Sequence, residues 1–114
     1  MNRRMLAVPL IGCVMLAACP SHDSGSGHQA YGDPRLVAQG RQLFAAYCAP
    51  CHGALGHGGQ VGPDLSASRF KYGKTRAELV QTIMKGRRGG MPAFAAQLQS
   101  GQADALAAYL RQLQ

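Results

Sequence analysis

The sequence is poor in aromatic and acidic residues. Among 114 residues there is no Trp, with only three Phe and four Tyr. Single-stranded nucleic acids are bound largely by stacking on aromatic side chains, so we expect no nucleic-acid partner. Five Asp and Glu residues stand against 12 Lys and Arg, which gives a formal net charge of +7. A basic balance of this size favours acidic partners.

The sequence also shows neither the alternating pattern of β-strands nor an apolar run of the length that usually spans a membrane. No run alternates between apolar and polar residues as a half-buried strand does. The apolar run from Met5 to Ala18 follows Arg3 and Arg4 and is short for crossing a bilayer. A charged start followed by a short apolar run is typical of a secretory signal, so we expect export.

The end of that run, Leu16-Ala17-Ala18-Cys19, resembles a bacterial lipobox. The resemblance implies a signal peptide over residues 1–18, cleavage before Cys19 and lipid attachment to its sulfur. Ordinary cleavage, with Cys19 removed or left free, is the alternative. Several acyl chains hold a protein stably on a membrane, so we expect an anchored lipoprotein on the periplasmic side. Residues 19–33 are rich in Gly and Ser and are expected to form a flexible tether.

The clearest functional motif is Cys48-Ala49-Pro50-Cys51-His52. Its spacing is the c-type haem attachment pattern C-x-x-C-H. One turn of backbone places both sulfurs on one side, where they form thioether bonds with the two vinyl groups of a haem. The next residue, His52, then lies under the iron as the proximal ligand. We therefore expect one haem c, bound covalently through Cys48 and Cys51.

Other roles for this motif fit less well. A thioredoxin-like cysteine pair accompanies a βαβ pattern, and no strand pattern is present. A structural zinc site takes four nitrogen or sulfur ligands. After the motif the chain offers only His57 and no further cysteine.

Helix signals precede the motif. Asp33 and Pro34 form an N-cap and a first helical residue, and the following helix carries an apolar face of Leu36, Leu43, Phe44 and Tyr47. Gly40 inside this helix costs about 1 kcal/mol relative to Ala. A glycine at such a place usually marks the close approach of another backbone, here expected to be the last helix of the chain.

Two more helices are expected after the motif. A capping box from Thr75 to Glu78 opens one that stops at Gly86, with apolar positions Leu79, Val80, Ile83 and Met84. The last helix has Ser100 as its expected N-cap. Its apolar stripe consists of Leu106, Tyr109, Leu110 and Leu113.

Two loops complete the expected haem site. A glycine-rich loop after His52 can follow a flat ring closely and closes at Gly62-Pro63-Asp64-Leu65, where Leu65 is available to pack on the haem. A second loop displays Met91 between glycines and a proline. A methionine there can aim its thioether at a metal, so we interpret Met91 as the sixth iron ligand.

With these three motifs in this order, residues 34–114 resemble class I cytochromes c. The resemblance implies an all-α cytochrome c fold, with about three main helices around one haem c and with His52 and Met91 as axial ligands. It also implies that the Pro63 carbonyl accepts a hydrogen bond from His52 Nδ1 and that Gly40 and Phe44 cross the last helix at Tyr109. The lipobox and tether lie outside this domain.

An iron with both axial positions filled favours one-electron transfer over catalysis. We therefore expect a membrane-tethered electron carrier of an extracytoplasmic respiratory chain, and not an enzyme. Basic residues near the Met91 loop (Lys85, Arg87 and Arg88) are placed to steer redox proteins with an acidic docking surface. An ordinary solvated basic surface explains them equally well.

Two other functions stay open at this point. In a haem sensor or enzyme, Met91 would dissociate, and His57 is the only candidate for a distal group. In a fixed electron-transfer subunit of a larger oxidoreductase, the same fold would be docked permanently. The chain would accordingly be a monomer or a subunit of a respiratory complex.

Overall fold

The computed structural model describes residues 31–67 and 70–114. The expected signal peptide over residues 1–18, the lipidation of Cys19 and most of the tether lie outside these ranges. The described part contains four α-helices and one π-helical segment, in the order α1 (Pro34–Leu43), η1 (Phe44–Cys48), α2 (Ala49–His52), α3 (Arg76–Lys85) and α4 (Gln102–Gln112). Within these ranges no helix has the length and apolarity needed to span a bilayer.

The first helix runs straight into the Cys-x-x-Cys-His motif, as expected from the sequence. Its N-cap is Asp33, whose side chain accepts a hydrogen bond of 2.8 Å from the Arg35 amide. η1 and α2 then continue the helical path without a break, until Gly53 ends it with a φ of 81°. Because a π-helical turn contains more residues than an α-helical one, η1 rotates the motif relative to the face of α1. Helical periodicity alone did not predict this segment.

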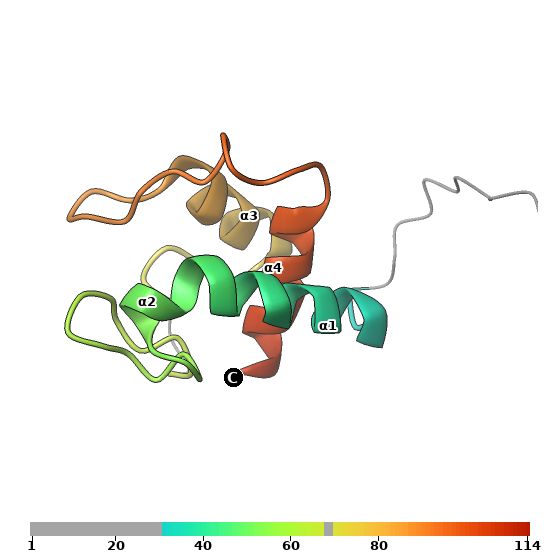
Figure 1. The fold of residues 1–114 in the computed structure, drawn as a ribbon, viewed down its shortest axis with the longest axis horizontal. Helices are drawn as coiled ribbons and strands as arrows, with labels where there is room; N and C mark the ends of the chain where they lie inside the picture. Colours follow the sequence, from blue (N-terminus) through green and yellow to red (C-terminus); the bar gives the residue numbers. More distant parts are fainter. Residues whose placement is uncertain (1–30, 68–69) are drawn as a thin grey trace, which may run out of the picture.

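Helices α1 and α4 cross at Gly40, and Figure 1 shows α4 behind α1 at this crossing. A Cβ atom on Gly40 would collide with the carbonyl oxygen of Ala105 and lie 2.8 Å from the Cβ of Tyr109. One turn further on, the rings of Phe44 and Tyr109 pack with their centroids 5.3 Å apart. The predicted close approach of the two backbones is confirmed.

The core lies between α1, α3 and α4. It contains Phe44 and the apolar face of α4, packed against Leu79 and Ile83 of α3. The stripe predicted for the last helix is buried at Leu106, Tyr109 and Leu110, and half-buried at Leu113. An ion pair of 2.6 Å between Arg76 and Asp104 joins the N-terminal ends of α3 and α4.

The capping predictions have different outcomes for the two later helices. Thr75 and Glu78 form the expected capping box of α3, and Gly86 ends this helix. The expectation that Ser100 caps α4 is wrong, because the N-cap is Gly101, in the left-handed conformation with a φ of 80°. The side chain of Gln102 instead reaches back and accepts a 2.8 Å hydrogen bond from the Gln99 amide.

Candidate functional site

His52, at the end of α2, has a fixed orientation. Its Nδ1 atom lies 2.8 Å from the carbonyl oxygen of Pro63. A carbonyl oxygen can only accept, so Nδ1 carries the proton and the Nε2 lone pair is free to bind a metal. The hydrogen bond implied by the family resemblance is therefore present. It gives the imidazole the tautomer that an iron ligand needs.

The turn that brings Pro63 to His52 depends on Gly62. A Cβ atom at this position would lie 2.8 Å from His52 Nδ1 and 2.9 Å from the carbonyl oxygen of Cys51. The Gly62 amide itself donates a 2.9 Å hydrogen bond to that Cys51 oxygen. The end of the glycine-rich loop is thus tied directly to the attachment motif.

Backbone hydrogen bonds fold the rest of this loop back on the motif. The Gly58 amide donates a 2.8 Å hydrogen bond to the His52 carbonyl. The Leu65 amide donates a 2.6 Å hydrogen bond to the Gly56 carbonyl. Gly53, Gly56 and Gly58 all have positive φ angles, between 75° and 88°. Such a path is accessible mainly to glycine, which explains the glycine density of the segment. Leu65 is half-buried against the hydrophobic core.

A polar network on this loop was not predicted from the sequence. Asp64 Oδ1 accepts hydrogen bonds from the Ser66 amide at 2.7 Å and from the Ser66 hydroxyl at 2.6 Å, and His57 Nδ1 lies 2.8 Å from that hydroxyl oxygen. The hydrogen bonds from Ser66 hold the pKa of Asp64 below its ordinary value. The Asp-x-Ser spacing is the local signal for such a turn. His57 is thereby held on the exposed loop that follows His52.

The two motif cysteines are partly buried, and no disulfide joins them. Burial is the main cause that raises the pKa of Cys48 to about 11, with a smaller contribution from Cys51. An apolar setting of this kind suits the porphyrin ring. No polar or charged side chain is buried elsewhere among residues 31–67 and 70–114, so the described core is apolar too. The residues present therefore fit a covalently attached haem.

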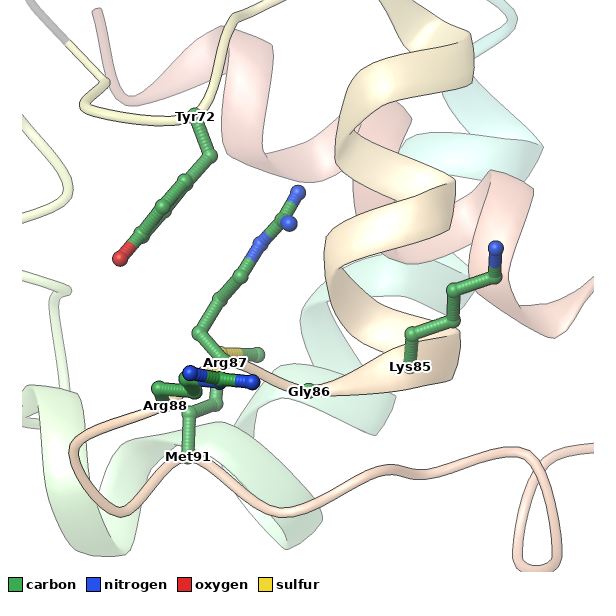
Figure 2. Close-up of a pocket in the computed structure, with 6 residues that line it drawn as sticks. All are labelled: Tyr72, Lys85, Gly86, Arg87, Arg88 and Met91. Atoms are coloured by element: carbon green, nitrogen blue, oxygen red, sulfur yellow. The ribbon is translucent and has the colours of Figure 1, made fainter.

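Met91 lies on the loop between α3 and α4. Figure 1 shows this loop extending from the same side of the molecule as α2. Met91 is partly buried and lines a pocket together with Tyr72, Lys85, Gly86, Arg87 and Arg88 (Figure 2). Phe94, three residues later, packs its ring edge-on against Tyr47 of η1, with centroids 6.1 Å apart. Tyr47 itself is 37% exposed.

The basic residues near this loop differ in their surroundings. Lys85 and Arg88 are exposed. Arg87 is partly buried, with its guanidinium 4.3 Å from the centre of the Tyr72 ring. A steering role is therefore better suited to Lys85 and Arg88 than to Arg87.

Comparisons with known proteins agree with these features. Residues 35–110 match the family described as cytochrome c oxidase, cbb3-type, subunit III. The cbb3-type oxidase subunit FixP of Azorhizobium caulinodans is 40% identical over 86 residues, which cover 74% of this chain and 29% of that protein. Subunit CcoP of Rubrivivax gelatinosus is 42% identical over 64 residues, covering 56% of this chain and 21% of that protein. The chain thus spans less than a third of the length of these relatives.

Solved structures give the same fold. Cytochrome cL from Methylophaga aminisulfidivorans has a TM-score of 0.65 and 27% identity, with 72% of this chain and 55% of that chain covered. The c-type cytochrome NirC has a TM-score of 0.55 and 37% identity, with coverage of 70% and 93%. The predicted all-α cytochrome c fold is confirmed. The chain belongs to the cbb3-type cytochrome c oxidase subunit III family, and its domain is a class I cytochrome c with one haem c bound covalently through Cys48 and Cys51.

Proposed function

We propose that this chain is an electron-transfer subunit of a respiratory oxidoreductase. The observation that carries the proposal is the family match over residues 35–110, because the relatives in that family are named as oxidase subunits. From the sequence alone, a fixed subunit was the alternative to a membrane-tethered carrier. The named relatives favour the subunit. No catalytic role is assigned to the chain itself.

Each site residue has a proposed role. Cys48 and Cys51 would hold the haem, His52 Nε2 and the Met91 sulfur would bind its iron, and the Pro63 carbonyl orients the imidazole. Leu65 contributes apolar contact at the ring. The haem would supply one-electron redox chemistry when bound. As ligands of the iron, His52 and Met91 would keep other ligands away from it.

An optical spectrum of the haem-loaded protein in both redox states tests these roles. We expect a low-spin spectrum with the weak sulfur-to-iron charge-transfer band, and only slow binding of carbon monoxide, limited by the release of Met91. Met91→Ala should abolish the band and remove this limit on carbon monoxide binding. A wild-type protein that is high-spin or binds carbon monoxide readily would overturn Met91 ligation and support the sensor or enzyme alternative.

Isolation from native membranes tests the subunit assignment. We expect the chain to co-migrate with the other subunits of an oxidase in mild detergent and to stay with them at high salt. A chain that leaves the membrane fraction alone would instead support a membrane-tethered carrier. Two observations support that second candidate. One is the lipobox-like segment ending at Cys19. The other is that the match covers 93% of the c-type cytochrome NirC, so a domain of this kind makes up nearly all of that chain.

Attachment through Cys19 on the periplasmic side is part of the same proposal. It is supported by the charged start, the short apolar run and the small residues before Cys19. Mass spectrometry of the mature protein should find a chain that begins at a diacylglyceryl-modified Cys19. Cys19→Ser should release the protein in soluble form, whereas an unmodified Cys19 in the wild type would contradict the anchor.

A further inference from the structure

The loop that bears Met91 is fixed at its base and open at its tip. At the base, the Arg87 amide donates a 3.0 Å hydrogen bond to the Met91 carbonyl, and the Phe94 amide donates one of 3.1 Å to the Ile83 carbonyl. At the tip, Cβ atoms placed on Gly89 and Gly90 would have no neighbour within 4 Å. The position of Met91 therefore depends on the contacts at the base.

Arg87 adds a side-chain contact to this base. Its Nε atom donates to the hydroxyl oxygen of Thr82, one turn before the end of α3, at 3.1 Å, and its Nη2 atom contacts the same oxygen. Its guanidinium also lies over the ring of Tyr72, which belongs to the segment before α3. Figure 2 shows the Arg87 side chain extending away from the loop between Tyr72 and α3. One residue thus connects the Met91 loop to two other parts of the molecule.

We propose that Arg87 is a positioning residue that holds the Met91 loop in place and so keeps the Met91 thioether on the iron. The inference rests on the proposed ligation by Met91. Opening of the loop must precede any exchange of this ligand, and the cost of local opening depends on the contacts that are broken. With Arg87 in place, opening breaks its backbone bond to Met91, its hydrogen bonds to Thr82 and its contact with Tyr72.

Two variants remove the hydrogen bonds between Arg87 and Thr82, one by changing the donor and one by changing the acceptor. Arg87→Met keeps an apolar stem but removes the charge and the donors. Thr82→Val keeps the shape of the side chain but removes the hydrogen-bond acceptor. Arg88→Met is the matched control, because it removes the same charge from the adjacent, exposed residue. Arg87→Lys restores the charge without the forked geometry and should rescue only in part.

The first measurement is the rate of carbon monoxide binding to the ferrous, haem-loaded protein. We expect Arg87→Met to bind at least tenfold faster than the wild type and Thr82→Val several-fold faster, with Arg88→Met within twofold of the wild type. In urea, the sulfur-to-iron charge-transfer band of Arg87→Met should disappear before the helical circular dichroism signal. In the wild type the two should disappear together.

The outcomes separate this inference from the proposed function. A wild type without the charge-transfer band would refute Met91 ligation itself. A wild type with the band, but with equal rates in Arg87→Met and Arg88→Met, would refute only the role of Arg87. If Arg87→Met does not retain haem, Thr82→Val decides, and an unchanged rate in that variant would also overturn the inference.

Discussion

At the scale of single residues, the loop after the attachment motif has its polar contacts concentrated on Asp64. Its carboxylate accepts two hydrogen bonds from Ser66, and these lower its pKa in the folded state. A carboxylate with a depressed folded pKa stabilises the fold fully above its unfolded pKa. This contribution is lost as the pH falls through the folded pKa.

Ser66→Ala should therefore make stability less dependent on acid pH. Without the hydroxyl, the folded pKa of Asp64 returns toward its ordinary value of 3.8, and less stability is lost on acidification. Urea unfolding of the haem-loaded protein between about pH 6 and pH 3 measures this slope. Ser100→Ala, outside the loop, is the control and should keep the slope of the wild type. An equal slope in the wild type and Ser66→Ala would contradict the prediction.

At the scale of helices, the packing of α1 against α4 depends on a residue without a side chain, Gly40, at the point where the two helices cross. Gly40 is buried against the backbone of α4 at Ala105, and Tyr109 lies beside it. Separating α1 from α4 would open the core around Phe44 and Leu106, both of which are almost fully buried. The packing of α1 against α4 thus determines where η1 and α2 place Cys48 and Cys51.

Gly40→Ala should destabilise the protein although Ala favours helices. The gain in helix propensity is about 1 kcal/mol, but the methyl group would collide with the Ala105 carbonyl. We expect a net loss of about 3 kcal/mol in the free energy of unfolding, measured by urea denaturation. Gly32→Ala, where a Cβ meets nothing within 4 Å, is the control and should change stability by less than about 0.5 kcal/mol. A loss of similar size in both variants would argue against the crossing.

Local signals predicted these elements better than they predicted the contacts between loops. The caps at Asp33, Thr75 and Gly86 depend on neighbouring residues alone, and each was found where the sequence placed it. The cap at Ser100 was wrong because a left-handed Gly101 begins the helix one residue later. The contact between Arg87 and Tyr72 joins residues 15 positions apart across α3, so it was not visible until the fold was known.

At the scale of the whole molecule, the start of the domain is attached to its last helix. The Tyr31 hydroxyl donates a 2.9 Å hydrogen bond to the Ala107 carbonyl, 76 residues later. The guanidinium groups of Arg76 and Arg111 lie 5.6 Å and 5.0 Å from the centre of the Tyr31 ring. The segment expected to belong to the tether is therefore packed against the domain at Tyr31.

Tyr31→Phe should weaken this attachment while keeping the ring. Removal of the hydroxyl leaves the Ala107 carbonyl without this partner, and we expect a loss of about 1 kcal/mol in the free energy of unfolding. Faster hydrogen exchange at the amides near residue 31 should accompany it, measured by mass spectrometry. Tyr47→Phe is the comparison, since Tyr47 is 37% exposed and should tolerate the change. Equal stabilities of Tyr31→Phe and the wild type would refute the contribution of the hydroxyl.

The unbroken helical path from Pro34 to His52 also sets a length. Its 19 residues extend over roughly 28 Å at the rise of an α-helix. The chain enters this path at the start of α1, and α2, which ends the path, lies at its other end (Figure 1). With a lipid anchor at Cys19, this helix would separate the point where the tether joins the domain from the redox centre. The tether would then hold the domain by the end remote from the haem and leave the haem end free to meet redox partners.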